Sequence, residues 1–432
     1  MKHHSSSVIQ LPPSFRCFVL IMALLSAMSV VAQGPNEANY DEARVPQYVL
    51  PDVLTCADGT VVTSVRAWER HRRPELMAML ASLEYGFTPK GMKNVRMSHQ
   101  LVKENREALD GLATMQQVQL TFSRGGVSRE ALMLVFIPNV RKGRVPVIVG
   151  YNFRGNHSVM EDEEILYSPY FQLLPNHEDP VLKRGNQSSR WAVRDIVKRG
   201  YALVTMCYQD IFPDVADGGP RSVTALCDAE SEPGTAWQAL GAWAWGSSRM
   251  ADWVVKQRWA NKHQLVIMGH SRQGKAALWA GAQDKRFAVV ISNDSGCGGA
   301  ALSKREFGER VGQITRSFPH WFCSNFSRYG GREQELPFDQ HELLALIAPR
   351  HLYVASAVED RWADPHGEYL AAYHASPVFA LYGLKGLSSP DMPAVNAPIM
   401  NHVGYHIREG IHDVTDYDWA CYLDFCDKAF GR

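Results

Sequence analysis

The sequence lacks any excess of one charge, because 45 lysine and arginine residues balance 45 aspartate and glutamate residues. It also lacks a long basic run. Proteins that bind nucleic acids present a cationic face to the phosphates. We therefore do not expect nucleic acid as a partner.

Long apolar runs are also scarce. The main one, CFVLIMALLSAMSVVA at residues 17–32, follows the positive charges of Lys2 and Arg16 and ends in small residues. This pattern is typical of an export signal, so we predict a signal peptide at residues 1–32 and an exported protein, periplasmic or extracellular. An uncleaved anchor is the alternative, but a membrane-spanning helix needs about 20 apolar residues. We expect no membrane association after cleavage.

Cysteine is sparse, with 8 residues in 432, and no two of them form a CxxC pair. A structural zinc site is therefore not expected. Cleavage after residue 32 leaves an odd number of cysteines, so at least one thiol must be free or must bridge two chains. The cysteines that remain are Cys56, Cys207, Cys227, Cys297, Cys323, Cys421 and Cys426.

The mature chain begins with residues 33–60, which are rich in proline, asparagine and aspartate and predict an extended arm. No linker divides residues 61–432, so we predict a single domain there and expect a monomer. An amphipathic helix is predicted at residues 66–84, interrupted near Pro74. Alternating residues at 116–122 and 130–137 predict a hairpin around Gly125 and Gly126.

The later part of the chain alternates apolar strands with helices. Short apolar runs, typical of strands buried on both faces, occur at residues 145–150, 201–208, 264–268, 287–292 and 351–356. Helical patterns separate several of them, notably at residues 236–255 and 274–283. This alternation predicts an α/β fold with a mainly parallel central sheet sandwiched between helices.

The strongest chemical signal is the segment QLVIMGHSRQGKAAL at residues 264–278. An apolar strand ends at Gly269, Ser271 lies in a glycine-flanked turn, and a helix follows. This is the strand–turn–helix elbow that exposes a nucleophilic serine in the α/β-hydrolase fold. The second glycine, Gly274, comes one position later than in G-x-S-x-G. A serine in a turn can also be a helix cap, so the assignment of Ser271 as a nucleophile depends on the strand before it and the helix after it.

A nucleophilic serine needs a histidine base, which follows it near the chain end in this fold. The segment GYHIREGIHDVTDYDW offers His406 and His412. His412 lies in a loop after Gly410 and before a terminal helix, where such a base belongs. His406 alternates with its neighbours like a strand residue, so we favour His412.

A third residue should orient the imidazole. Two carboxylate sites follow strand ends: Asp294, and the pair Glu359–Asp360. The second is the usual position of the acid in α/β-hydrolases, but either aspartate could instead order a loop or cap a helix. The sequence leaves Asp294 and Asp360 as alternatives.

Several motifs together resemble the bacterial glucuronoyl esterases, carbohydrate esterase family 15. These motifs occur in the order GYNFRGNHS, GHSRQGK, SNDSGCGGA, ERVGQITRSFPHWF, LPFDQHELLALIAPR, SAVEDRWADPHGEY and GYHIREGIHDVTDYDW. The resemblance covers roughly residues 140 to 430. It implies an α/β-hydrolase fold and cleavage of the ester between lignin alcohols and 4-O-methyl-glucuronic acid of xylan, without a metal or another cofactor.

The resemblance also implies roles for individual residues. Ser271 would be the nucleophile and His412 the base, and Arg272 would stabilise the oxyanion through its backbone N–H and its guanidinium. The residues that match sugar-contacting positions are Lys275, Glu309 and Trp362. Each of these three also has a structural interpretation: a solvated helix lysine, a surface charge and a core tryptophan.

Two positions depart from the family pattern. His270 stands where many members have a cysteine bridged near the catalytic histidine, so that disulfide is absent here. Asp294 stands where many members have glutamate, and its shorter side chain reaches less far toward His412. We therefore favour Asp360 as the acid and keep Asp294 as a second carboxylate.

Two rival functions remain from the sequence. Another carbohydrate esterase, such as an acetyl-xylan esterase, could use the same scaffold, because a fold does not fix a substrate. A non-catalytic carbohydrate-binding relative would need no triad, and the ordered set of serine, histidine and candidate acids argues against it.

Overall fold

The fold is built around one twisted sheet whose central strands run parallel. The computed structural model describes residues 38–172, 182–227 and 232–432. In space the strand order is β1-β2-β3-β5-β4-β6-β7-β8-β10-β9. In chain order the strands are β1 (Arg96–Ala108), β2 (Ala113–Arg124), β3 (Val127–Pro138), β4 (Val145–Asn152), β5 (Ala202–Cys207), β6 (Ala260–His270), β7 (Phe287–Asn293), β8 (His351–Ala357), β9 (Ile399–Met400) and β10 (Val403–Arg408).

Neighbouring strands from β5 through β4, β6, β7 and β8 to β10 pair in parallel, whereas β1, β2, β3 and β9 join the sheet antiparallel. Every residue of β4 and β5 is buried, as expected for strands covered on both faces. The prediction of a mainly parallel sheet is confirmed. The hairpin is confirmed as well, with Arg124 paired to Val127 across its turn.

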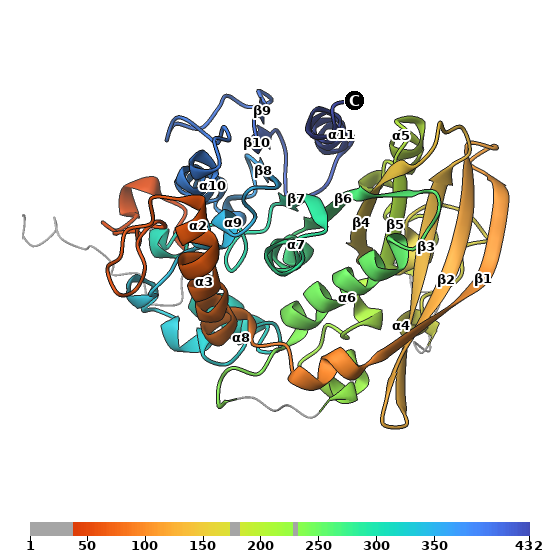
Figure 1. Cartoon of the computed structure of the whole chain (residues 1–432), viewed down its shortest axis with the longest axis horizontal. Helices are drawn as coiled ribbons and strands as arrows, with labels where there is room; N and C mark the ends of the chain where they lie inside the picture. The colour runs from red at the N-terminus through yellow and green to blue at the C-terminus, as the bar shows by residue number, and fades with distance from the viewer. Residues whose placement is uncertain (1–37, 173–181, 228–231) are drawn as a thin grey trace, which may run out of the picture. The chain divides into compact units, whose positions relative to one another are not determined.

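Helices cover both faces of the sheet (Figure 1). They are α2 (Val65–Ala67), α3 (Arg73–Leu80), α4 (Pro169–Gln172), α5 (Val193–Lys198), α6 (Ala239–Val254), α7 (Arg272–Gln283), α8 (Val311–Ser317), α9 (Gln340–Ala345), α10 (Pro365–Leu381) and α11 (Asp416–Phe430). Helices α6, α7 and α10 pack on one face, while α5 and α11 pack on the other. Alternate residues of each central strand therefore enter two separate cores, such as Ile267 in one and Val266 in the other.

One helix prediction was wrong in detail. The chain does not break at Pro74 but stays helical across residues 65–85, with π-helical turns at Trp68–Arg72 and Ala81–Tyr85. Proline has no N–H to donate, and the wider π turn just before Pro74 accommodates the missing bond.

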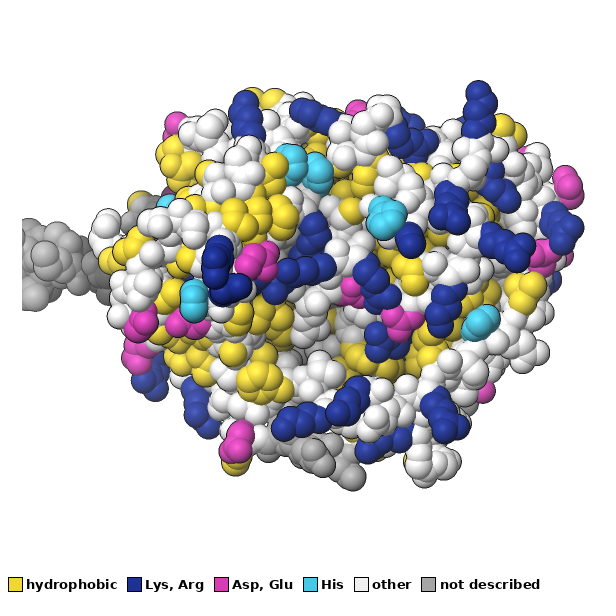
Figure 2. Space-filling view, in the orientation of Figure 1, with side chains coloured by type: hydrophobic (Ala, Val, Ile, Leu, Met, Phe, Trp, Pro, Cys, Tyr) yellow, Lys and Arg dark blue, Asp and Glu magenta, His cyan; other side chains and the backbone are white. Residues whose placement is uncertain are grey.

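The described part of the chain also shows the state of the cysteines, the character of the helices and the distribution of surface charge. The seven cysteines in it are all buried, and those with free thiols include Cys56, Cys207, Cys297, Cys323, Cys421 and Cys426, so the prediction of at least one free thiol is confirmed. No helix within these ranges is long and apolar enough to cross a membrane. The predicted signal peptide lies outside the described residues. Figure 2 shows basic side chains spread over the visible face, with acidic and histidine side chains between them.

Candidate active site

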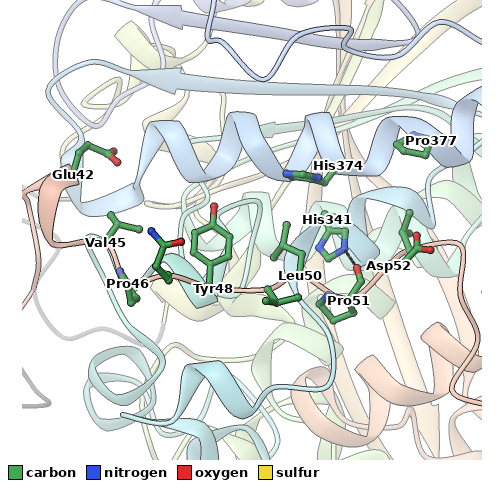
Figure 3. A pocket seen from close by; sticks show the side chains of 13 residues that line it. Glu42, Val45, Pro46, Tyr48, Leu50, Pro51, Asp52, His341, His374 and Pro377 are labelled. Carbon is green, nitrogen blue, oxygen red and sulfur yellow. Dashed lines mark hydrogen bonds between the residues drawn. The ribbon is translucent and has the colours of Figure 1, made fainter. Parts of the chain in front are cut away.

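One cavity, of about 730 Å³, lies between the arm and helices α9 and α10. Arm residues such as Tyr48 and Leu50 form one wall, and His341 and His374 lie opposite (Figure 3). His341 contacts the carbonyl oxygen of Pro51 through Nε2 at 2.9 Å, and burial lowers its pKa to about 3. This histidine is therefore a neutral, structural residue, and the cavity wall holds no serine or cysteine nucleophile.

Ser271 lies at the elbow between β6, which ends at His270, and α7, which begins at Arg272. Its backbone has φ 56° and ψ −129°, a conformation that residues with a Cβ rarely adopt. The flanking glycines allow the sharp turn. A Cβ at Gly269 would lie 1.9 Å from the carbonyl oxygen of Gln273, and one at Gly274 would lie 2.8 Å from the Ser295 side chain. The late second glycine thus lets α7 approach the next loop closely.

Two cavities share Ser271, Arg272 and His412 in their walls. The first, which we call the Lys275 cavity, has about 330 Å³ and is also lined by Lys275, Asp294, Glu309, Phe318, Trp321, Asp360 and Trp362. The second, the Arg154 cavity, has about 340 Å³ and is also lined by Phe153, Arg154, Gln187, Arg190, Tyr208, Gln209 and His270. The structure therefore brings together all eight site residues predicted from the sequence around the Lys275 cavity.

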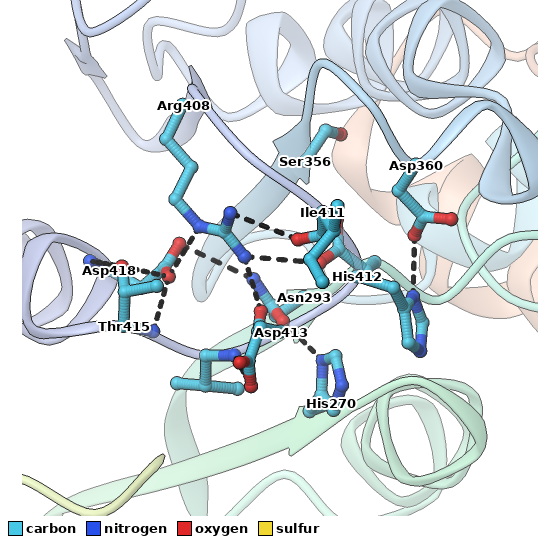
Figure 4. Close-up of polar contacts among 12 residues, drawn as sticks. His270, Asn293, Ser356, Asp360, Arg408, Ile411, His412, Asp413, Thr415 and Asp418 are labelled. Carbon is cyan, nitrogen blue, oxygen red and sulfur yellow. Dashed lines mark hydrogen bonds and ion pairs between the residues drawn. The ribbon is translucent and has the colours of Figure 1, made fainter. Parts of the chain in front are cut away.

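His412 and Asp360 form a polar pair within the site (Figure 4). His412 Nδ1 lies 2.5 Å from Asp360 Oδ2. Asp360 is buried, whereas 40% of the His412 side chain is exposed. A carboxylate on Nδ1 fixes the tautomer and leaves Nε2 free to exchange a proton.

Asp294 is close to this pair but bonded to neither residue. One ligand atom from each of Asp294, Asp360 and His412 lies within 4.8 Å of the others. Neither carboxylate oxygen of the buried Asp294 accepts a hydrogen bond from the described residues. Burial and the charges of Glu368 and Asp360 raise its pKa well above the ordinary value, against the opposing charge of Arg408. Burial thus makes Asp294 a weaker acid than an exposed aspartate.

Among the described residues, Asp294, Asp360 and His412 also lie close enough together to ligate a metal ion. The Arg408 guanidinium lies 3.6 Å from Asp294 Oδ2, and Asp360 already contacts the imidazole nitrogen. A nearby fixed cation repels a second one. The environment of this cluster thus opposes metal binding.

Two buried residues that the sequence analysis did not single out hold the loops of the site. Glu368, on α10, accepts hydrogen bonds from the backbone N–H groups of Ser295 at 2.7 Å and Gly296 at 2.9 Å. Arg408, at the end of β10, donates to the carbonyl oxygen of Ile411 at 3.1 Å and to Asp418 at 2.7 Å. Glu368 therefore shapes the loop after Asp294, and Arg408 shapes the loop that carries His412.

The Arg272 side chain is fixed by Asp214. It forms an ion pair with Asp214 Oδ2 and lies over the Trp321 ring at 4.7 Å. Asp214 also accepts hydrogen bonds from Tyr208 and Trp321 and contacts His320. Burial alone would raise the Asp214 pKa, but these donors and Arg272 together hold it well below the ordinary value. The guanidinium beside Ser271 is thus paired with a permanent anion.

The three predicted sugar-contacting residues lie in the Lys275 cavity. Lys275 is buried and donates to the backbone carbonyls of Ser295 and Cys297, which occupy two of the three N–H donors of an ammonium. Burial raises the pKa of Glu309, although the charge of Lys275 opposes this shift. Trp362 is 41% exposed. The cavity thus offers a cation, an acidic acceptor and an aromatic face.

Two further histidines near the site, His406 and His270, are both buried. His406 is buried on β10, where Nδ1 contacts the Tyr353 hydroxyl and Nε2 contacts Asp418, so it has no access to substrate. His270 packs its ring 4.5 Å from that of His412 and contacts Asn293. Burial lowers the pKa of His270 well below its ordinary value. A neutral imidazole therefore packs against His412.

Comparisons with known proteins agree with this geometry. A family model described as fungal glucuronyl esterase matches residues 231–383. A carbohydrate esterase, MZ0003, of an unknown prokaryotic organism is 40% identical over 425 residues, which cover 95% of this chain and 97% of the relative. A 4-O-methyl-glucuronoyl methylesterase of Phanerochaete carnosa is 33% identical over 386 residues, covering 86% of this chain and 83% of the relative. The solved glucuronoyl esterase from Solibacter usitatus is 41% identical, with a TM-score of 0.84 over 90% of this chain and 100% of that one.

Proposed function

Because the chain belongs to carbohydrate esterase family 15, the glucuronoyl esterases, we propose that Ser271, His412 and Asp360 act as its catalytic triad. The chain is a carboxylic ester hydrolase of the glucuronoyl esterase type. We propose as its substrate the ester of 4-O-methyl-glucuronic acid with a lignin alcohol in glucuronoxylan. The contact of 2.5 Å between His412 Nδ1 and Asp360 Oδ2 is the observation that carries the triad.

The reaction proceeds in two acyl-transfer steps. His412 Nε2 takes the Ser271 proton while the hydroxyl oxygen attacks the uronate ester carbonyl. The oxyanion forms beside the Arg272 guanidinium and the backbone N–H at the start of α7, which stabilise its charge. His412 then returns the proton to the leaving alcohol, and water hydrolyses the glucuronoyl-enzyme by the same route.

The two cavities suit the two parts of the ester. We place the uronate in the Lys275 cavity, where Lys275 donates to sugar hydroxyls, Glu309 accepts from them and Trp362 packs on the ring. The alcohol then occupies the Arg154 cavity, whose Phe153 and Tyr208 rings provide apolar surface and whose glutamines and arginines donate hydrogen bonds. Asp294 serves as a second, buried carboxyl group beside Asp360 and His412.

We further propose that the enzyme acts after export, once residues 1–32 are removed. The basis is the pattern of positive charge, apolar run and small residues in that segment. N-terminal sequencing of the exported protein should begin at Gln33. Retention of the apolar run in the secreted enzyme would contradict cleavage.

The test of the function is hydrolysis of benzyl glucuronate by the wild type and by Ser271→Ala, compared with hydrolysis of acetylated xylan. We expect turnover of the glucuronate ester that the serine substitution abolishes without lowering the melting temperature. Faster cleavage of acetylated xylan would favour an acetyl-xylan esterase. Failure of the wild type to react with a fluorophosphonate would favour the non-catalytic carbohydrate-binding relative.

A further inference from the structure

One exposed aromatic ring lines the Lys275 cavity, and a second lies on the arm beside the loop of Glu309. In the described ranges the exposed large aromatic side chains are Tyr40, Phe87 and Trp362, at 40%, 44% and 41%. Trp362 lines the cavity, and Tyr40 belongs to the arm that packs on the loops behind it. Apolar surface left in water next to a binding cavity is a mark of recognition.

The arm is fixed to the cavity wall through backbone contacts. The Asn39 carbonyl oxygen accepts a hydrogen bond from the Gly308 N–H at 2.8 Å, and the Glu309 N–H donates to the Trp362 carbonyl oxygen at 2.9 Å. A Cβ at Gly308 would lie only 2.4 Å from that Trp362 oxygen. Gly308 therefore lets three chain segments meet, and this places Tyr40 next to the loops of Glu309 and Trp362.

The Tyr40 ring is held in place on the arm. It packs edge-on against Phe307 with 6.4 Å between ring centroids, and the Arg361 guanidinium lies 5.6 Å from its centroid. In the chain, Arg361 adjoins Asp360, and Phe307 is two residues before Glu309. Asp360 and Glu309 both line the Lys275 cavity, so the Tyr40 ring packs on the two segments that form this part of the cavity wall.

We propose that Tyr40, on the arm beside the loop of Trp362, is a substrate-binding residue that contacts the sugar to which the uronate is glycosidically attached. This inference rests on the proposed function, because the uronate must occupy the Lys275 cavity. An aromatic ring with a hydroxyl suits a sugar, since it offers an apolar face and a hydrogen-bonding group.

The test compares two esters that share one leaving alcohol: benzyl glucuronate, and the benzyl ester of glucuronic acid carried on a xylotriose. We expect Tyr40→Ala to raise KM for the oligosaccharide ester about 3- to 10-fold, the range of a lost aromatic contact. KM for benzyl glucuronate should not change. Tyr40→Phe should retain most of the affinity, and Val49→Ala, an exposed position on the same arm, should alter neither KM.

An equal change in both KM values, or no change in either, would overturn the role of Tyr40. If Tyr40→Ala lowers the melting temperature, Tyr40→Leu retains apolar contact with Phe307 but lacks the aromatic face, and it repeats the test. A wild type that cleaves neither ester would instead overturn the proposed function.

Discussion

Replacing each of the two candidate acids with asparagine tests which one orients the base. Asp360→Asn removes the anion that contacts His412 Nδ1 at 2.5 Å. Asp294→Asn replaces a carboxylic acid whose oxygens accept no hydrogen bond from the described residues. We expect the first substitution to impair catalysis strongly and the second to impair it little.

The magnitudes follow from these environments. Loss of the carboxylate from such a triad lowers kcat by about 10⁴-fold. Because 40% of the His412 side chain is exposed, water can replace part of the lost hydrogen bond. We therefore expect a loss of about 10²- to 10³-fold, or about 2.7–4 kcal/mol of activation free energy. For Asp294→Asn the expected loss is below about 10-fold, since the amide has the shape of a carboxyl group whose oxygens accept no hydrogen bond from the described residues.

Stability gives a second readout for Asp294. Because its pKa is raised in the folded protein, the folded chain keeps a proton that the unfolded chain releases above about pH 4. Wild-type stability therefore falls as the pH rises through the interval between the two pKa values. An amide releases no proton, so the melting temperature of Asp294→Asn relative to the wild type should increase from about pH 5 to about pH 8.

The assay is benzyl glucuronate hydrolysis under saturating substrate, with thermal melts of each variant as the control for folding. A larger kcat loss in Asp294→Asn than in Asp360→Asn would refute the assignment of Asp360. A melting-temperature difference that does not depend on pH would refute a protonated Asp294.

Three further substitutions test other parts of the site. Asp214→Asn should lower kcat about 10-fold or more, because the Arg272 guanidinium loses its anionic partner; an unchanged kcat in the ester assay would contradict this. Lys275→Met should raise KM about 10-fold with a smaller effect on kcat. Initial rates measured over a range of substrate concentrations separate KM from kcat, and a thermal melt checks that the loop held by Lys275 stays folded. Ser271→Gly should abolish turnover, because the nucleophilic hydroxyl is removed. It should also raise the unfolding free energy by about 1–3 kcal/mol, since glycine adopts a positive φ without steric cost. A variant that is less stable than the wild type in a denaturant titration would argue against backbone strain at Ser271.

The parallel strands and the elbow could be predicted from the sequence because both depend on local patterns. Apolar runs predicted each central strand, and glycines on both sides of Ser271 predicted the sharp turn. The edge strand β1 was not predicted, since its sequence RMSHQLVKENREA is polar on both faces. It is a strand because β2 pairs with it, and a partner is not visible in a local window.

The contacts of the site were less predictable, because they join residues far apart in the chain. Asp294 and Asp360 both follow strand ends, and only their spatial arrangement around His412 separates them. Asp214 is 58 residues from Arg272 and carries no motif that signals the pairing. Glu368 is the lone acidic residue within a mostly apolar helix, a pattern that could have indicated a buried role.

The position of Gly308 between the arm and the Trp362 loop ties the arm to the wall of the Lys275 cavity. Glu42 binds Arg305, which also holds Asp364, the N-cap of α10. Trimming the chain beyond residue 38 would therefore disturb residues some 270 positions later, as the Asn39–Gly308 pairing indicates. A recombinant chain shortened to residues 61–432 would lack these contacts, so affinity tags are better attached at the C-terminus, after α11.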